Sequence, residues 1–192
     1  MSGWKGPVGR ALAAVVKQVG TFSDAPSRAL TAGERALLNH IFQGALAFEP
    51  IVVRESLSGL LNVSRRAFVI ENTIHLPMPP HAAPPHLLVH EATHVWQFQH
   101  GGHAYIADSI VAQTVGDGYA LEKGLLQGRR WHELNCEQQA TLVEQAWVQR
   151  CFDGRPFIVR GRDWTASFDE ARAALRAGAG ARFTSSGGTR GR

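Results

Sequence analysis

The sequence predicts an α+β fold, in which a mainly helical domain carries a small β-sheet ahead of a histidine-rich helix. Apolar residues recur at helical intervals over 32–44, 85–101 and 136–152. Short runs rich in β-branched residues, at 51–54, 67–70 and 73–76, precede the second of these helices. Proline is frequent over 77–85, and a helix interior excludes it, so the histidine-rich helix should begin near Pro85.

Length and composition indicate one domain that buries a core of ordinary size. The 192 residues are 44% hydrophobic and 19% charged. We expect a flexible N-terminal arm over 1–27, the folded domain over 28–178 and a disordered basic tail over 179–192. No run approaches eighteen apolar residues, and the N-terminal apolar piece is too short for an export signal. The sequence therefore predicts a soluble protein with no membrane span and no Sec signal.

The basic character of the sequence is concentrated near its C-terminal end. Eight arginines and three acidic residues follow Gly154, whereas the rest of the chain is close to neutral. Spaced arginines among glycine and alanine are typical of a solubilising tail, so a nucleic-acid partner is not expected. Cys136 and Cys151 flank one predicted helix, which places them roughly 22 Å apart, beyond the reach of a disulfide. We expect two unpaired cysteines in a reducing compartment.

The individual elements follow from local signals along the chain. Thr31-Ala-Gly-Glu34 has capping-box spacing and opens the first helix, and Gly101-Gly102 closes the histidine-rich one. Asn135 is a plausible cap for the helix that follows it. A turn at 71–72 joins the last two predicted strands. The remaining expected elements are a helix over 104–115, a strand at 158–159 and a short helix over 169–177.

The histidine-rich helix carries the motif His90-Glu-Ala-Thr-His94. Two histidines four residues apart lie on one face of a helix, so both imidazoles can bind one cation. Glu91 lies about 100° around the helix, where it can reach a water molecule bound to that cation. The pattern is typical of zinc hydrolases and predicts Zn²⁺ as cofactor, with Glu91 as the catalytic base in a zincin-like domain.

A catalytic zinc ion needs a third protein ligand, and a later helix offers two candidates. Glu137 begins that helix, and the small residue Ala140 one turn later permits close helix approach. Glu144 lies seven residues further on, on about the same face, and is the rival third ligand or an acceptor for a histidine N–H. His100 has the metzincin position for a third histidine, but Gln97 replaces the glycine that this spacing requires.

Two stretches of the chain, His90-Glu-Ala-Thr-His-Val-Trp-Gln97 and Asn135-Cys-Glu-Gln-Gln-Ala140, together carry a family resemblance. The chain resembles, over residues 28–155, the zinc-metallopeptidase domains at the C-termini of VgrG-type spike proteins of type VI secretion, and stand-alone Vgr-related bacterial proteins. The resemblance implies a gluzincin-like site with His90, His94 and Glu137 as metal ligands and Glu91 as the catalytic residue. The chain lacks the spike region of those proteins.

The predicted function is hydrolysis of peptide bonds by a metal-activated water, with a peptide or protein as substrate. The resemblance implies a bacterial antagonism effector, made in the cytoplasm and secreted by a type VI-like apparatus, with an apparatus component or an immunity protein as partner. The alternative is a non-enzymatic adaptor that retains a metallopeptidase fold. Four residues could stabilise the oxyanion, and the sequence does not choose among them: His103, Tyr105, Tyr119 and His132.

Overall fold

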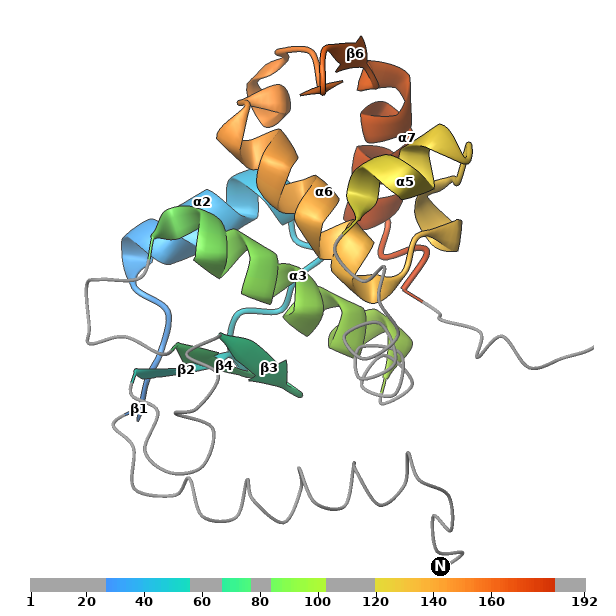
Figure 1. Ribbon diagram of the computed structural model, residues 1–192. Coiled ribbons are helices and arrows are strands. Elements are labelled where there is room, and N and C mark those ends of the chain that lie inside the picture. The colour runs from blue at the N-terminus through green and yellow to red at the C-terminus, as the bar shows by residue number, and fades with distance from the viewer. Residues whose placement is uncertain (1–26, 56–66, 77–83, 103–119, 182–192) are drawn as a thin grey trace, which may run out of the picture.

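The computed structural model describes residues 27–55, 67–76, 84–102 and 120–181, and its elements form three layers (Figure 1). A small sheet lies on one side of the central helix α3, and a group of helices around α6 lies on the other. The longer helices are α2 (Ala32–Phe42), α3 (Pro85–Gly101), α6 (Cys136–Val148) and α7 (Thr165–Arg176). The shorter ones are α5 (Leu121–Leu126) and two 3-10 turns, η2 (Trp131–Glu133) and η3 (Cys151–Asp153).

The sheet has the strand order β1-β2-β4-β3. Strand β1 (Ser27–Arg28) runs antiparallel to β2 (Val52–Glu55), β2 runs parallel to β4 (Thr73–Leu76), and β3 (Phe68–Ile70) runs antiparallel to β4. Val53, Ile74 and Val69 stand opposite one another in the register and are buried, so they share the face that packs on α3. A separate pair, β5 (Ile158–Val159) and β6 (Arg162–Asp163), precedes α7.

Helix α3 is buried on all sides over its middle turns, since every residue from Leu88 to Gln97 is shielded from solvent. An ordinary surface helix buries one stripe only, so this pattern identifies α3 as the inner layer of the fold. Polar residues in this stretch therefore need partners inside the protein, because an unsatisfied buried polar group is costly. The motif His90-Glu-Ala-Thr-His94 lies within this stretch.

Capping boxes begin two of the helices, and Arg28 joins three elements by ion pairs. Thr31 and Glu34 form a reciprocal capping box at the start of α2, and Asn135 and Gln138 form another at the start of α6. Arg28 of β1 contacts Glu34 of α2 at 2.7 Å and Glu55 of β2 at 2.6 Å, which ties three elements together. The Arg28 ion pairs therefore hold the start of α2 against the edge of the sheet.

Most of the predicted elements are present. The capped helix after Thr31, the strands around the turn at 71–72, the helix from Pro85 to Gly101 and the strand at 158–159 are confirmed. Both cysteines are free, as expected. None of the described helices is long and apolar enough to cross a membrane. Three predicted segments lie outside the described residues: the helix over 104–115, residues 1–26 of the N-terminal arm, and the tail beyond 181.

Two helix boundaries differ from the prediction, and one additional helix is present. Helix α6 ends at Val148 rather than 152, because Arg150 adopts a left-handed conformation with φ of 62° that a helix cannot continue through. Helix α7 begins at Thr165 rather than 169, where the Asp163 carboxylate accepts the Thr165 N–H and O–H. Helix α5 was not expected, since the glycines around it indicated a loop; its buried leucines, 121 and 125, stabilise it by packing.

The packed part of the chain also extends beyond residue 178, the predicted end of the folded domain. The backbone carbonyl of Ala179 accepts a hydrogen bond from the Trp131 indole at 2.9 Å, and that of Gly180 accepts one from Gln139 at 3.0 Å. Ala181 is buried. Residues 177–181 therefore form a C-terminal segment that belongs to the folded domain.

The first prediction concerns His75, whose ring stacks on Phe68 at 4.4 Å. Burial, and then the positive charge of Arg54, lower the pKa of His75 to about 4. The folded state thus favours the neutral ring, so its stabilisation is complete above about pH 6.5 and is lost as the pH falls toward 4. We expect this to remove up to about 3 kcal/mol from the free energy of unfolding.

Urea unfolding of the metal-free protein between pH 7.5 and 4.5 measures this effect, with His75→Phe as the reference that keeps a ring but cannot titrate. The wild type should lose more stability than the variant over this range. Parallel pH profiles for the two proteins would contradict the assignment.

Candidate metal centre

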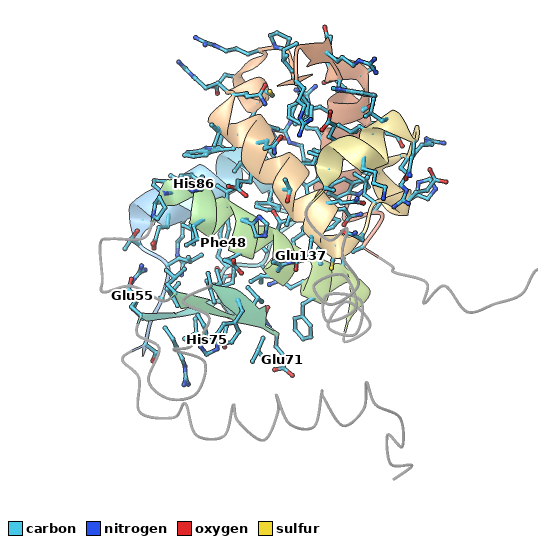
Figure 2. The ribbon with its side chains drawn as sticks, viewed as in Figure 1. Phe48, Glu55, Glu71, His75, His86 and Glu137 are labelled. Atoms are coloured by element: carbon cyan, nitrogen blue, oxygen red, sulfur yellow. The ribbon has the colours of Figure 1, made fainter. Side chains whose placement is uncertain are left out.

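The candidate site lies where α6 crosses the middle of α3. His90 and His94 are one turn apart on α3, and their rings lie 5.0 Å apart between centroids. Glu137 enters from the first turn of α6 at the crossing point (Figure 2). The three residues are buried, with exposed fractions of 9%, 6% and 1%. A carboxylate so deeply buried needs positive partners, which the two imidazoles and a cation can supply.

The three side chains direct their donor atoms to one point. Glu137 Oε2 lies 3.5 Å from His90 Nε2 and 3.4 Å from His94 Nε2. These distances exceed those of ordinary N–H···O hydrogen bonds, which lie between about 2.7 and 3.2 Å. Among the described residues, this is the one group of three His, Cys, Asp or Glu side chains whose ligand atoms all lie within 4.8 Å of one another. The group could hold a metal ion.

A second partner holds the other nitrogen of each imidazole. His90 Nδ1 lies 2.9 Å from Glu144 Oε2, and His94 Nδ1 lies 2.8 Å from Gln97 Oε1. Because a carboxylate and an amide oxygen can only accept, each Nδ1 carries a proton and each Nε2 is the ring atom left to face a ligand. Of the two glutamates that the sequence left open, Glu137 thus faces the imidazole Nε2 atoms and Glu144 supports His90 from behind.

Charge at the site shifts the protonation of two groups. Burial alone would lower the pKa of His90, but its contacts with Glu137 and Glu144 outweigh burial and raise the pKa to about 10. In the metal-free protein, that imidazole therefore holds a proton that a metal must displace. Burial raises the pKa of Glu91, against the opposing effect of the two histidines. Glu91 Oε2 makes no hydrogen bond within the described part of the chain.

A cleft of about 410 Å³ opens beside the histidines. His90 and Glu91 lie in its lining with Glu144 of α6, and the other lining residues are Ala67, His86, Leu87 and Thr141. His86, near the N-terminal end of α3 (Figure 2), also lines a neighbouring hollow of about 540 Å³. Glu91 thus lines a cleft that is open to solvent. His86 lines both this cleft and the neighbouring hollow.

The remaining histidines lie as follows. His86 is half-buried at the rim of the cleft. His100 is exposed near the end of α3 and contacts the carbonyl of Ala45 at 2.7 Å, so it lies outside the candidate site. Of the oxyanion candidates, His132 is exposed on η2, while His103, Tyr105 and Tyr119 lie outside the described residues.

Two buried glutamines, Gln97 and Gln139, support the site, and neither was predicted to do so from the sequence. The Oε1 atom of Gln97 contacts His94 Nδ1. The Gln97 amide N–H groups donate to the Cys136 carbonyl and to Gln139 Oε1, both on α6. A glutamine three residues after a metal-ligating histidine on the same helix is within reach of that ring, which is the signal that could have identified it. Trp96, in contrast, is a fully buried core residue.

Comparison with protein-family models, curated proteins and solved structures finds no match to this chain. The chemical interpretation of the site therefore rests on its donor set and geometry. Two imidazole nitrogens and one carboxylate oxygen form a compact donor set, and the Glu91 carboxylate borders it. Such a set suits a divalent cation of the first transition row.

The second prediction separates the roles of Glu137 and Glu144. Removal of a metal ligand should abolish tight metal binding. Removal of a residue that only hydrogen-bonds to a ligand should weaken metal binding without abolishing it. Glu137→Ala should lose the metal when purified protein is loaded with zinc and analysed for elemental content. Glu144→Gln should keep about one metal ion per chain but with an affinity reduced by about 10- to 100-fold in a chelator competition.

The half-buried residue Glu170, which pairs with Arg130 outside the site, provides the matched control, since Glu170→Ala should bind metal like the wild type. Full metal retention by Glu137→Ala, together with metal loss by Glu144→Gln, would reverse the two roles.

Proposed function

We propose that this protein is a zinc-dependent peptidase that hydrolyses peptide bonds with a metal-activated water, in a zincin-like fold. The observation that carries the proposal is the convergence of His90, His94 and Glu137 next to Glu91, a buried carboxylate that faces the cleft. A structural metal site has no use for a base at this position, whereas a hydrolytic site requires one.

The donor set fits zinc in particular. Zinc in proteins binds imidazole nitrogen and carboxylate oxygen at about 2.0–2.2 Å, and its catalytic sites combine three protein ligands with one open position. Two donors on a tetrahedral ion with such bonds lie roughly 3.3–3.6 Å apart. The separations of 3.5 and 3.4 Å between Glu137 and the two histidines agree with this value. When bound, zinc would lower the pKa of a water ligand to about 7 and polarise the scissile carbonyl.

Glu91 has the properties of the general base. Burial raises its pKa above that of an ordinary glutamate, which makes the carboxylate a stronger proton acceptor. Its Oε2 has no hydrogen-bond partner within the described residues, so it is available to a water molecule or a substrate. In the proposed reaction, Glu91 takes the proton of the attacking water and passes it to the leaving amine.

The shape of the cleft supports a polypeptide substrate over a small one. The cleft at Glu91 and the hollow beyond His86 share a lining residue, so an extended chain can occupy both. The lining of the hollow combines apolar side chains, among them Trp147 and Phe152, with the charged Arg150 and Asp153, and it can bind a substrate residue distant from the cleaved bond. A single amino acid or dipeptide would leave this second space unused.

The family resemblance supports a role as a type VI secretion effector in antagonism between bacteria, with an immunity protein or an apparatus component as partner. The alternative, a non-enzymatic adaptor, requires only the fold. The two differ in their need for Glu91, because an adaptor would tolerate its loss. Nucleic acid remains an unexpected partner.

The third prediction tests the enzyme directly. Glu91→Gln keeps the size of the side chain and removes the base, so it should retain about one zinc ion per chain and lose roughly 10²- to 10⁴-fold in kcat/KM. Cleavage of an unstructured protein, fluorescently labelled casein, measures the rate, and elemental analysis measures the metal. The exposed Glu133 is the matched control, and Glu133→Gln should cleave at the wild-type rate.

Two outcomes would overturn the proposal. A Glu91→Gln variant that cleaves as fast as the zinc-loaded wild type would remove the base from the mechanism. A variant that loses its metal together with its activity would make Glu91 a ligand or a structural residue instead.

A further inference from the structure

We infer that two glutamines, Gln97 and Gln139, are positioning residues that make metal binding depend on the C-terminal segment 177–181. The inference rests on the proposed metal site and extends it to residues that touch no ligand atom. Together these two glutamines are called the glutamine bridge. It runs from His94 on α3, past the start of α6, to the backbone of Gly180.

The bridge is fully buried and its amide N–H groups are all used. Gln97 donates to the carbonyl of Cys136 at 2.9 Å and to Gln139 Oε1 at 3.0 Å. Gln139 donates to the carbonyl of Trp131 at 2.9 Å and to that of Gly180 at 3.0 Å. Both glutamines have an exposed fraction of 0%. With both N–H groups of each amide donating to fixed carbonyl oxygens, each Oε1 can only accept.

This direction of hydrogen bonding sets the tautomer of His94. Gln97 Oε1 accepts, so His94 Nδ1 must carry the proton and His94 Nε2 must present its lone pair toward Glu137. If the Gln97 amide were reversed, its N–H groups would face His94 Nδ1, and its bonds to Cys136 and Gln139 would be lost. The bridge therefore prepares His94 as a ligand before any metal arrives, which lowers the cost of binding.

The bridge also sets the distance between the two helices that supply the ligands. Cys136, whose carbonyl accepts from Gln97, directly precedes Glu137 on α6. A single side chain thus holds His94 and the backbone next to Glu137. The far end depends on the C-terminal segment, because Gly180 supplies one of the two acceptors of the Gln139 amide, and Trp131 next to it bonds to Ala179.

Gly180 offers a way to disturb the bridge from outside the site. Its φ is +85°, and a Cβ atom there would lie 2.5 Å from Trp131 Cδ1, so a side chain would displace the segment. Gly154 has a similar φ of +90° and open space around a Cβ. Gly154→Ala therefore reproduces the backbone strain of Gly180→Ala without displacing the segment.

The test measures the zinc dissociation constant by competition with a fluorescent chelator, and the free energy of unfolding of the same proteins without metal. Gln97→Leu should weaken zinc binding by about 10- to 100-fold. Gly180→Ala should weaken it in the same direction. Gln99→Leu is the matched control on α3, because Gln99 bonds to Ala47 and Asn72 and not to the site, and its zinc affinity should stay at the wild-type value.

A double-mutant cycle completes the test. If Gln97 and Gln139 act as one unit, Gln97→Leu combined with Gln139→Leu should weaken zinc binding by less than the product of the two single effects. The inference is overturned if Gln97→Leu and Gly180→Ala lower metal-free stability but bind zinc as the wild type does. A wild type that binds no zinc would overturn the proposed function as well, whereas unchanged zinc binding in the variants with Glu91-dependent cleavage intact would overturn the bridge alone.

Discussion

The buried carboxylate of Glu137 is the constraint on which the rest of the structure depends. A carboxylate at 1% exposure costs several kcal/mol unless positive charge or strong donors surround it. Its neighbours are the Nε2 atoms of two histidines that a helix places one turn apart. The crossing of α3 and α6 has to occur where these groups meet. This requirement accounts for the complete burial of α3 between the sheet and α6, and for the small residue Ala140 in the buried start of α6.

The two histidines have different hydrogen-bond partners at Nδ1, and these partners differ in charge. A carboxylate backs His90, and a neutral amide backs His94. A carboxylate raises the basicity of an imidazole more than an amide does, so His90 is the stronger electron donor to a bound cation. Glu144 also borders the cleft, whereas Gln97 is fully enclosed. One histidine is thus held by a group that solvent can approach, and the other by a group enclosed in the interior of the protein.

The parts of the fold that local chemistry determines could be predicted from the sequence. The capping box at Thr31, the proline at the start of α3 and the spacing of His90 and His94 each depend on neighbouring residues, and the structure has all three. The meeting of His94 with Glu137 depends on how two helices far apart in the sequence pack. The sequence offered both Glu137 and Glu144 at the same helical face, and only the depth of each on α6 separates them. The glutamine bridge was not predicted because its hydrogen bonds connect four separate segments.

Composition was a poor guide to the C-terminal limit of the folded part. Residues 177–181 are alanine and glycine only, which by themselves indicate flexible chain. Their side chains contribute little, yet two of their carbonyl oxygens complete the hydrogen bonding of a buried indole and a buried amide. An expression design that ended at residue 178 on compositional grounds would leave those two donors facing an apolar interior or admit water beside the helix pair. The useful end point for a shortened version of this protein is therefore decided by backbone acceptors, and it lies after Ala181.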